Sequence, residues 1–350
     1  MAERVVVMGG SFNPPTIAHW LLMRAALDAV DARVGYFVPV SFAYLKRKMV
    51  RAGQGHLSLP DDLRVDMLRA MAASDERLRV YTDVMDRPFS NDCELMGRIQ
   101  EAHPGSTAYG VFGADKLGLL EHFATDRDFF GRYGCVFFAR EGERLDAGLV
   151  GRDLCARNAD ALVFASAPAE AEGISSTRVR DHLFDIDAVA DMLHPSVVPM
   201  LRGLRREDFP EEVIQFRGDF AFLSNDYAAE VDYDGITYPC AASAFLASKF
   251  KDRQTRLVVS RMRSDRAKQK YGASVGDAEW EGRRLSTMEK IVRSKFSQHP
   301  DLARKLAETD GLRLIAGEKK KRPDTFWGVD IVRWEGQNHL GKILMRLREE

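Results

Sequence analysis

Two side chains able to contact phosphate follow the first apolar run of the sequence, VVVMGGSFNPP. Thr16 and His19 are three positions apart, so in a helix that begins near Thr16 they would lie on one face of the first turn. The unpaired N–H groups and positive dipole end of such a turn attract anions. A hydroxyl and an imidazole would complete a phosphate site, and Gly9 and Gly10 would let the backbone approach the ligand closely. A histidine that happens to lie near a helix start is the alternative that these residues alone leave open.

A second group of candidate phosphate contacts lies in the stretch GISSTRVRDHL. Ser175, Ser176 and Thr177 are of the types that begin helices, and Arg180 would project from the first turn toward a phosphate. Lys46, in PVSFAYLKRK, adds a further cation, for which a solvated surface charge is the alternative. The first glycine turn carries no GKS, GKT or GxGxxG, so it is neither a P-loop nor a dinucleotide-binding fingerprint.

The elements that would position these residues alternate short apolar runs with helical patterns over residues 1–195. Strands are expected at 4–8, 32–40, 78–83, 108–114, 135–141 and 161–166, with amphipathic helices at 17–30 and 63–74. This alternation predicts an α/β fold with a parallel sheet.

A change of texture follows, at HPSVVPMLRGLRREDFPEEV, where three prolines and a charged cluster predict a linker over 196–213. Residues 214–350 then show strand-like pieces at 215–220, 230–234 and 236–239, followed by mainly helical sequence. We therefore expect a domain at 1–195 and a smaller, mainly helical α+β domain at 214–350.

Composition excludes several classes of protein. The 350 residues carry a net charge of −1 and are 45% hydrophobic and 29% charged, which is typical of a soluble protein and makes a nucleic-acid partner unlikely. No apolar run approaches the roughly 18 residues that span a bilayer, and MAERVVV has no signal-peptide pattern. Four scattered cysteines predict reduced thiols in a cytoplasmic protein. Nothing in the sequence indicates the oligomeric state.

The first half resembles a known family. GGSFNPPTIAH resembles the (H/T)xxH signature of the adenylyltransferases that act on nicotinamide or nicotinate mononucleotide, and GISSTRVRDHL resembles their ISSTxxR motif. The resemblance implies a Rossmann-like nucleotidyltransferase domain in which His19, Thr16, Lys46 and Arg180 are catalytic. It further implies contacts to ATP or the mononucleotide from Gly9, Gly10, Ser11, Phe12, Gly113, Asp115, Ser175, Ser176 and Thr177.

The reaction that this resemblance implies is adenylyl transfer from ATP to the mononucleotide, which gives NAD or deamido-NAD and pyrophosphate. The nucleophile is a phosphate that is already anionic, and the leaving group is magnesium-bound pyrophosphate. Positioning and charge neutralisation can therefore supply the rate without a general base. Mg²⁺ would be held mostly by phosphate oxygens and water, so no metal site built from protein side chains is expected.

The second half resembles the NADAR superfamily, through FAFLSNDY, DGITYPCAASAFLASKF, AEWEGRRLSTMEKIVRSKF, RPDTFWGVD and GQNHLGKILMRLR. Members of that superfamily cleave N-glycosidic bonds in riboflavin-pathway intermediates or ADP-ribosylated bases. The resemblance implies a pocket for an NAD- or ADP-ribose-like ligand, formed by Asn225, Lys249, Trp280, Asp324, Trp327, Asn338 and Gly341. Tryptophans suit stacking on a base or sugar, although a core position for both is the alternative.

One departure from the family pattern affects the expected activity. The family phrase reads approximately Y-P-x-x-E-H, and here Ala242 and Ser243 stand at the Glu and His positions. Without a carboxyl group to stabilise an oxocarbenium-like centre or move a proton, we expect this domain to bind its ligand and to cleave it poorly or not at all. Two alternatives stay open: a glycosidase with an accessory N-terminal half, and a non-catalytic sensor that binds nucleotide in both halves.

Overall fold

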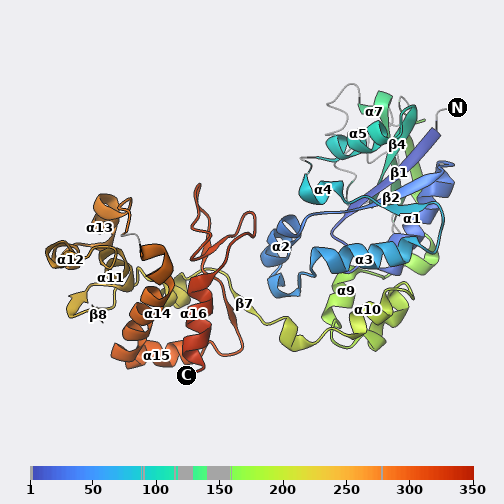
Figure 1. Ribbon diagram of the computed structural model, residues 1–350. Coiled ribbons are helices and arrows are strands. Elements are labelled where there is room, and N and C mark those ends of the chain that lie inside the picture. Colours follow the sequence, from blue (N-terminus) through green and yellow to red (C-terminus); the bar gives the residue numbers. More distant parts are fainter. Residues whose placement is uncertain are drawn as a thin grey trace. The chain divides into compact units, whose positions relative to one another are not determined.

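The structure, a computed structural model, describes residues 3–87, 89, 91–113, 116, 129–139, 158, 160–276 and 279–350. The chain forms two compact units, Met1–Phe209 and Pro210–Glu350 (Figure 1).

The first unit is built on a six-stranded parallel sheet in the order β3-β2-β1-β4-β5-β6. Its strands are β1 (Glu3–Gly10), β2 (Val34–Pro39), β3 (Leu78–Val80), β4 (Ser106–Gly113), β5 (Tyr133–Ala139) and β6 (Leu162–Ser166). All six strands expected from the sequence are present, and the α/β class is confirmed. The strand order reverses between β1 and β4, and in open sheets of this kind ligands bind at that point, beyond the carboxyl ends of the strands.

Helices cover both faces of this sheet. They are α1 (Ile17–Ala29), α2 (Phe42–Arg51), α3 (Asp61–Ala72), α4 (Asp83–Asp86), α5 (Asp92–Ala102), α7 (Phe129–Arg132), α9 (Ser176–Asp181) and α10 (Val198–Arg202), with 3₁₀ turns at Gly55–Leu57, Ala169–Ala171, Ile186–Met192 and Arg206–Asp208. Successive β1 residues face opposite sides. Val6 and Met8 pack with α1 and α3, whereas Val5 and Val7 pack with α5. Burial on both faces explains why β1 reads as a continuous apolar run.

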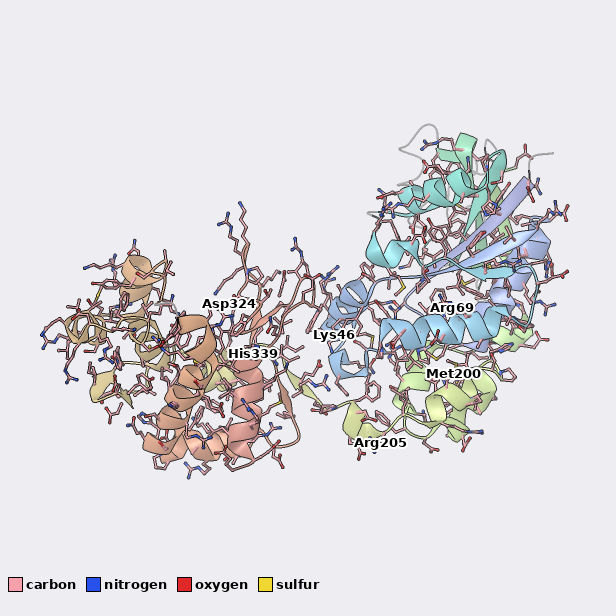
Figure 2. The ribbon with its side chains drawn as sticks, in the orientation of Figure 1. Lys46, Arg69, Met200, Arg205, Asp324 and His339 are labelled. Carbon is pink, nitrogen blue, oxygen red and sulfur yellow. The ribbon has the colours of Figure 1, made fainter. Side chains whose placement is uncertain are left out.

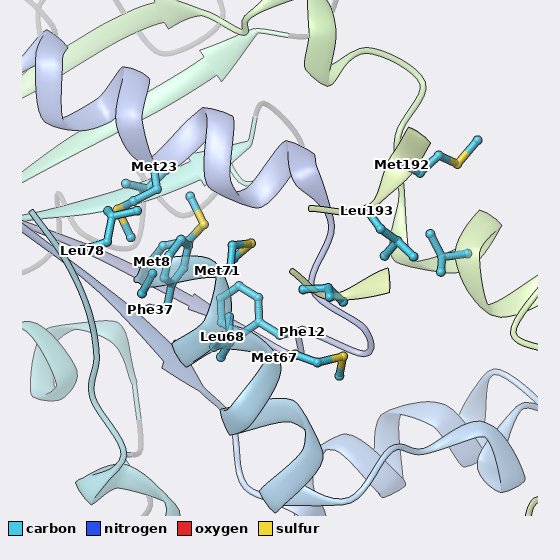
Figure 3. Packing of buried hydrophobic residues seen from close by; sticks show 14 of the residues in the cluster. Met8, Phe12, Met23, Phe37, Met67, Leu68, Met71, Leu78, Met192 and Leu193 are labelled. Carbon is cyan, nitrogen blue, oxygen red and sulfur yellow. The ribbon is translucent and has the colours of Figure 1, made fainter. Parts of the chain in front are cut away.

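The loop after β1 is anchored in the same core. Figure 3 shows the Phe12 ring among the buried side chains of α3, close to Met67 and Leu68, and Phe12 is 1% exposed. The backbone of Phe12 has φ = 43°, a conformation that costs a non-glycine residue energy. Burial of its ring therefore helps to hold the loop in this shape.

The expected linker at 196–213 is divided differently in the structure. Val197, Val198 and Leu201 are buried in the core of the first unit, and the boundary between the units follows Phe209. Pro199 lies in the first turn of α10, where a proline favours helix formation instead of interrupting it. The apolar spacing of this segment therefore outweighs its proline content.

The second unit is mainly helical, with short strand pairs. Its elements are β7 (Glu212–Val213), η7 (Gly218–Leu223), β8 (Val231–Tyr233), β9 (Ile236–Tyr238), α11 (Ala241–Ala247), α12 (Arg253–Ser260), α13 (Ser264–Tyr271), α14 (Trp280–Gln298), α15 (Pro300–Ala307), β10 (Arg313–Leu314), β11 (Gly317–Glu318), β12 (Val329–Asp330) and α16 (His339–Arg348). The prediction of a strand at 215–220 was wrong: residues 218–220 lie in the 3₁₀ helix η7, where the adjacent Phe222 and Leu223 are both buried. Adjacent buried residues do not fit the two-residue period of a half-buried strand.

The long helix α14 joins the two parts of this unit's core. Met288, Val292 and Phe296 pack with α15 and α16, while Ile291 packs with α11 and the β8–β9 hairpin. Among the residues that the structure describes, no helix has the length and apolar composition needed to cross a membrane.

Candidate functional sites

The first candidate site lies where β1 and β4 end. Gly9 and Gly10 close β1, Gly113 closes β4, and the two strands run parallel with Val7 opposite Gly110. The carboxyl ends of both strands therefore meet at one edge of the sheet, which is the edge where the strand order reverses. Asp115, which the family resemblance also implies as a nucleotide contact, lies outside the described residues.

His19 lies in the first turn of α1 with its ring orientation fixed by Thr16. The Thr16 backbone N–H donates to His19 Nδ1 at 3.0 Å, and Thr16 Oγ1 is 2.7 Å from the same nitrogen. Because a backbone N–H can only donate, Nδ1 is an acceptor and the ring proton is assigned to Nε2. Burial, partly offset by the bond from Thr16, lowers the pKa of His19 to about 4. At neutral pH the ring is therefore an uncharged donor through Nε2–H.

The position of Thr16 differs from the expectation that its hydroxyl faces phosphate. The residue is completely buried, and its hydroxyl donates to the imidazole. Thr16 therefore acts through His19, whose ring it orients. The ring of Phe12 adds an edge contact to His19, with the ring centroids 5.1 Å apart.

Two buried polar residues that the sequence analysis did not single out hold the glycine loop. Asn13 Nδ2 donates to the Leu57 carbonyl at 3.0 Å, and Asn13 Oδ1 accepts from the Leu59 N–H at 2.8 Å. Arg64, which is 0% exposed, donates to the carbonyls of Ser11 and Val40, each at 2.6 Å.

The sequence carries a signal for this role of Arg64, which also pairs with Asp61. The residue falls on the apolar face of the 63–74 pattern, and an arginine on a core-facing position needs polar partners. The clamp that Arg64 forms could therefore have been anticipated, although its acceptors could not.

Arg180 reaches the same loop from α9. Its Nη1 donates to the Asn13 carbonyl at 2.8 Å, and its Nε donates to Gln54 Oε1 at 3.2 Å. Nη2 donates to Thr177 Oγ1 at 3.0 Å. In the described part of the chain these bonds use three of the five N–H groups of the guanidinium, which leaves two for a ligand.

The serines before Arg180 fix the start of α9 against the loop. Ser175 caps the helix by accepting from the Arg178 N–H at 3.2 Å, and Ser176 Oγ donates to the Pro14 carbonyl at 2.8 Å. The start of α9 and the loop before α1 are therefore in direct contact, as the two sequence motifs predict.

Lys46 lies on the helix α2 (Figure 2). It is buried, and its Nζ donates to the Gly55 carbonyl at 2.6 Å, next to Gln54, the partner of Arg180. Its neighbours Leu45 and Met49 on the helix are also buried, a pattern visible in the sequence. Lys48, which was not expected at the site, donates to Ser11 Oγ at 3.2 Å. The structure thus brings Lys46 to the turn that supports the site and Lys48 to the glycine loop itself.

The second candidate site is a cavity of about 580 Å³ within the second unit. Five of the expected pocket residues line it: Asn225, Lys249, Trp280, Asp324 and Trp327. Ala242, at the position of the family glutamate, lines it as well. Further residues outside the expected set, mostly charged, also line it, namely Arg217, Asp226, Phe245, Lys268, Glu281, Arg284, Glu318 and Lys320.

An aromatic cluster forms part of the cavity wall. The Phe245 ring lies 5.2 Å from Trp280 and 5.1 Å from Trp327, measured between centroids. Trp280 is 6% exposed, whereas Trp327 is partly exposed. The tryptophans therefore fit both roles considered from the sequence, because their rings pack in the core and also present surface to the cavity on which a base or sugar can stack.

The carboxylates of the cavity have distinct surroundings. Asp226 pairs with Lys268 at 2.5 Å. Burial acts to raise the pKa of Asp226, but the bonds and charge of Lys268 outweigh it and hold that pKa below its usual range. Asp324 Oδ1 accepts from the N–H groups of Phe326 and Trp327 at 3.1 and 3.0 Å. Its Oδ2 has no hydrogen-bond partner among the described residues.

Two lysines support the polar wall. Lys249 Nζ donates to the Ser274 carbonyl at 3.1 Å; burial lowers the pKa of Lys249, and the charge of Glu281 opposes that shift. Lys295 is buried, and its Nζ donates to the carbonyls of Phe222 and Ser224 at 2.6 and 2.8 Å. Burial lowers the pKa of Lys295 to about 8. Lys295 thus positions the segment that carries Asn225 into the cavity.

Asn338 and Gly341, which were expected in the pocket, have a packing role instead. Asn338 Nδ2 donates to the Leu314 carbonyl at 2.8 Å, and its Oδ1 accepts from the Ala316 N–H at 3.0 Å. A side chain at Gly341 would place its Cβ 2.1 Å from the Leu314 oxygen. Both residues therefore allow α16 to pack closely against β10, and neither lines the cavity.

Comparisons with known proteins agree with this division. The family model for cytidylyltransferase-like proteins matches residues 7–182, and that for the NADAR domain matches residues 211–350. N-glycosidase YbiA of Escherichia coli (strain K12) is 32% identical over 135 residues, which are 38% of this chain and 82% of that protein.

Two further relatives share smaller parts of their own length. A riboflavin biosynthesis protein of Vibrio vulnificus (strain YJ016) is 34% identical over 134 residues, 37% of this chain and 35% of that protein. A protein of Shouchella clausii (strain KSM-K16) named "Probable nicotinate-nucleotide adenylyltransferase" is 30% identical over 119 residues, 34% of this chain and 58% of that protein.

Proposed function

The chain belongs to the cytidylyltransferase-like family through its first unit and to the NADAR family through its second, so it is a nucleotidyltransferase fused to a NADAR domain. We propose a substrate for each of the two units. The first unit transfers an adenylyl group from ATP to nicotinamide or nicotinate mononucleotide. The second unit binds an NAD- or ADP-ribose-related metabolite and cleaves its N-glycosidic bond poorly or not at all.

The proposed transfer needs little covalent chemistry from the protein. An oxygen of the mononucleotide phosphate attacks the α-phosphorus of ATP, the bond from that phosphorus to the bridging oxygen breaks, and pyrophosphate leaves with Mg²⁺. Such reactions depend on positioning and on stabilising the charge of the phosphates. Mg²⁺ enters with ATP as substrate. In this proposal the ion is held by phosphate oxygens and water.

The single observation that carries this proposal is the state of His19. Its Nε2–H belongs to a neutral ring at the amino end of the 13-residue helix α1, in contact with Phe12 of the loop that follows Gly9 and Gly10. A neutral donor there can bond a phosphate oxygen without first losing a proton, and the helix end adds unpaired N–H groups. The two remaining N–H groups of Arg180 supply the nearby positive charge.

The test of the first proposal is an assay for dinucleotide and pyrophosphate with the full chain, ATP and Mg²⁺. Each mononucleotide is supplied separately, and CTP replaces ATP in a parallel reaction because the family description refers to cytidylyl transfer. We expect equal amounts of dinucleotide and pyrophosphate with ATP and at least one mononucleotide. No product with either mononucleotide, or product with CTP alone, would contradict the proposal.

The proposal for the second unit rests on Ala242. Its methyl group lines the cavity where the family phrase has a carboxylate, and its N–H bonds the Asn225 carbonyl at 2.8 Å. The glycosidase alternative draws support from Asp324, whose Oδ2 is available in the same cavity.

Calorimetry with ADP-ribose and an assay for released base, both on the wild-type chain, separate these two possibilities. Binding without base release is expected, whereas rapid base release from an ADP-ribosylated substrate would favour the glycosidase. Binding in both units without any adenylyl transfer would instead favour the sensor.

A further inference from the structure

The charges that line the cavity of the second unit are almost all satisfied within the protein. Five cationic side chains face four carboxylates there. Lys268 pairs with Asp226, Arg284 with Glu281 at 2.9 Å and Lys320 with Glu318 at 2.7 Å, while Lys249 donates to main-chain carbonyls. The fifth cation is Arg217. Within the described part of the chain its guanidinium has neither a carboxylate nor a carbonyl partner.

The backbone around Arg217 is held at the cavity edge. The Gly317 N–H donates to the Ile214 carbonyl at 3.1 Å, and Gln215 Nε2 lies 3.4 Å from the Gly317 carbonyl. Arg217 is the N-cap residue of η7, in an extended backbone conformation, and Gly218, with φ = 55°, begins that helix. The side chain is exposed, but its base is fixed beside Gly317 and Glu318, which also line the cavity.

We propose that Arg217 is the residue of this cavity that binds a phosphate group of the ligand, and that it selects phosphorylated nucleotides over the corresponding nucleosides. A guanidinium presents parallel N–H groups that match two phosphate oxygens. The other cations already have carboxylate or carbonyl partners, so Arg217 supplies the excess positive charge that an anionic ligand needs. The aromatic surface of Trp327 and Phe245 accepts the flat or apolar part of the same ligand. This inference rests on the proposed function of the second unit.

The experiment compares the Kd of ADP-ribose and of adenosine for the full chain, by calorimetry. Trp327→Ala identifies the binding that belongs to this cavity, because it removes part of the aromatic wall. We expect Arg217→Gln to raise the Kd of ADP-ribose by about 10-fold to 100-fold, as the loss of a charge-assisted hydrogen bond does, and to leave the Kd of adenosine unchanged. Arg217→Lys retains the charge without the paired N–H groups, so its Kd for ADP-ribose should lie between those of the wild type and Arg217→Gln.

The matched control is Arg261→Gln, which removes an exposed arginine of the same unit that does not line the cavity. It should leave both Kd values unchanged. If Trp327→Ala weakens ADP-ribose binding but Arg217→Gln does not, the role of Arg217 is overturned and the proposed cavity function stands. If wild-type protein binds no ADP-ribose, or if Trp327→Ala has no effect on binding, the cavity function fails and the inference fails with it. An equal loss of adenosine and ADP-ribose affinity in Arg217→Gln would also overturn phosphate selection.

Discussion

In the first unit, the charged side chains around the glycine loop donate to main-chain oxygens, whereas in the second unit three of the five cationic side chains of the cavity pair with carboxylates. Arg64, Arg180 and Lys46 each hold a carbonyl of the loop or of the turn beside it. The pairs Lys268–Asp226 and Lys320–Glu318 instead join two side chains of the cavity wall, and Glu318 also accepts from the Asp324 N–H.

The difference teaches how each site tolerates change. Removal of a charge in the first unit releases a backbone carbonyl, so folding and catalysis should change together. In the second unit a cavity side chain can be replaced with little effect on the fold, so ligand binding or cleavage should change by itself. Each prediction below tests one side of this contrast.

The largest effect is expected from Ala242→Glu in the second unit. The substitution places a carboxyl group in the cavity where the family phrase has one, and general acid–base catalysis contributes on the order of 10²–10⁴ in rate. We therefore expect the release of base from an ADP-ribosylated substrate to increase by that order. Chromatography of the products measures it, and Ser243→Ala, at the adjacent buried position, should leave the rate at its wild-type level.

If Ala242→Glu binds ADP-ribose as well as the wild type but releases no base, the missing carboxylate is not what prevents cleavage. That result would contradict our explanation of the departure from the family phrase.

The next effect is on the stability of the first unit. Arg64→Met removes the guanidinium that bonds the carbonyls of Ser11 and Val40, and leaves Asp61 without its partner. Loss of the hydrogen bonds from this charged side chain costs about 1.5–3 kcal/mol each in the free energy of unfolding. Denaturant unfolding measures the change, and hydrogen exchange in β1 and α3 assigns it to this unit.

The control for this prediction is Arg69→Met on the same helix, because the Arg69 side chain is 63% exposed (Figure 2). It should change stability only slightly. Equal stability of the two variants would show that the Arg64 clamp does not hold the loop.

Most of the fold can be predicted from the sequence, because its strands and helices have clear apolar periods. The apolar run at Val5–Val7 and the turn at Gly9–Gly10 are sufficient to place the first site at the end of β1. The linker was harder to predict. Prolines suggested an interruption, but Val197, Val198 and Leu201 provide enough apolar surface to pack α10 on the first unit.

The sites are only partly predictable, for a physical reason. A motif indicates which residue types occur together, but it does not say whether a side chain faces the ligand or supports the backbone. Thr16 orients the His19 ring and Asn338 bonds the backbone of Leu314 and Ala316, so neither is a ligand contact in the structure. Arg64 bonds the loop after β1 and Arg217 lines the cavity, but no motif of the sequence indicated either role. Their partners are distant in the sequence, so only the folded chain identifies them.

A smaller effect is expected from Asn338→Ala. The substitution removes both bonds that join α16 to Leu314 and Ala316, and alanine adopts the left-handed backbone of this position (φ = 54°) less readily than asparagine. Unfolding should become easier by about 1–3 kcal/mol, with no change in the Kd of ADP-ribose. Gln337→Ala, an exposed neighbour, is the control for denaturant unfolding and calorimetry. A change in the Kd with unchanged stability would contradict the packing role and indicate that Asn338 contacts the ligand.

The smallest effect is the pH dependence that His19 confers. Its pKa is about 4 in the folded chain and about 6.5 in an unfolded one, so between these values the unfolded chain binds more protons. The stability that His19 contributes is present above pH 6.5 and is lost as the pH falls toward 4. Wild-type protein should therefore lose more stability than His19→Gln over this range.

Nitrogen-15 NMR of labelled histidine provides an independent check of this state. The spectrum should show an Nε2–H ring that does not titrate between about pH 5 and pH 8. Titration near the ordinary histidine value would contradict the neutral, buried ring.

The central claim is that a neutral imidazole at the start of α1 stabilises the phosphates during nucleotidyl transfer. It is tested most directly by the rate of pyrophosphate release from ATP and a mononucleotide, compared among wild type, His19→Ala and the exposed control His182→Ala. Loss of one such donor slows comparable enzymes by about 10²–10³. The account predicts that loss for His19→Ala in a folded protein and the wild-type rate for His182→Ala; a folded His19→Ala that turns over at the wild-type rate would contradict it.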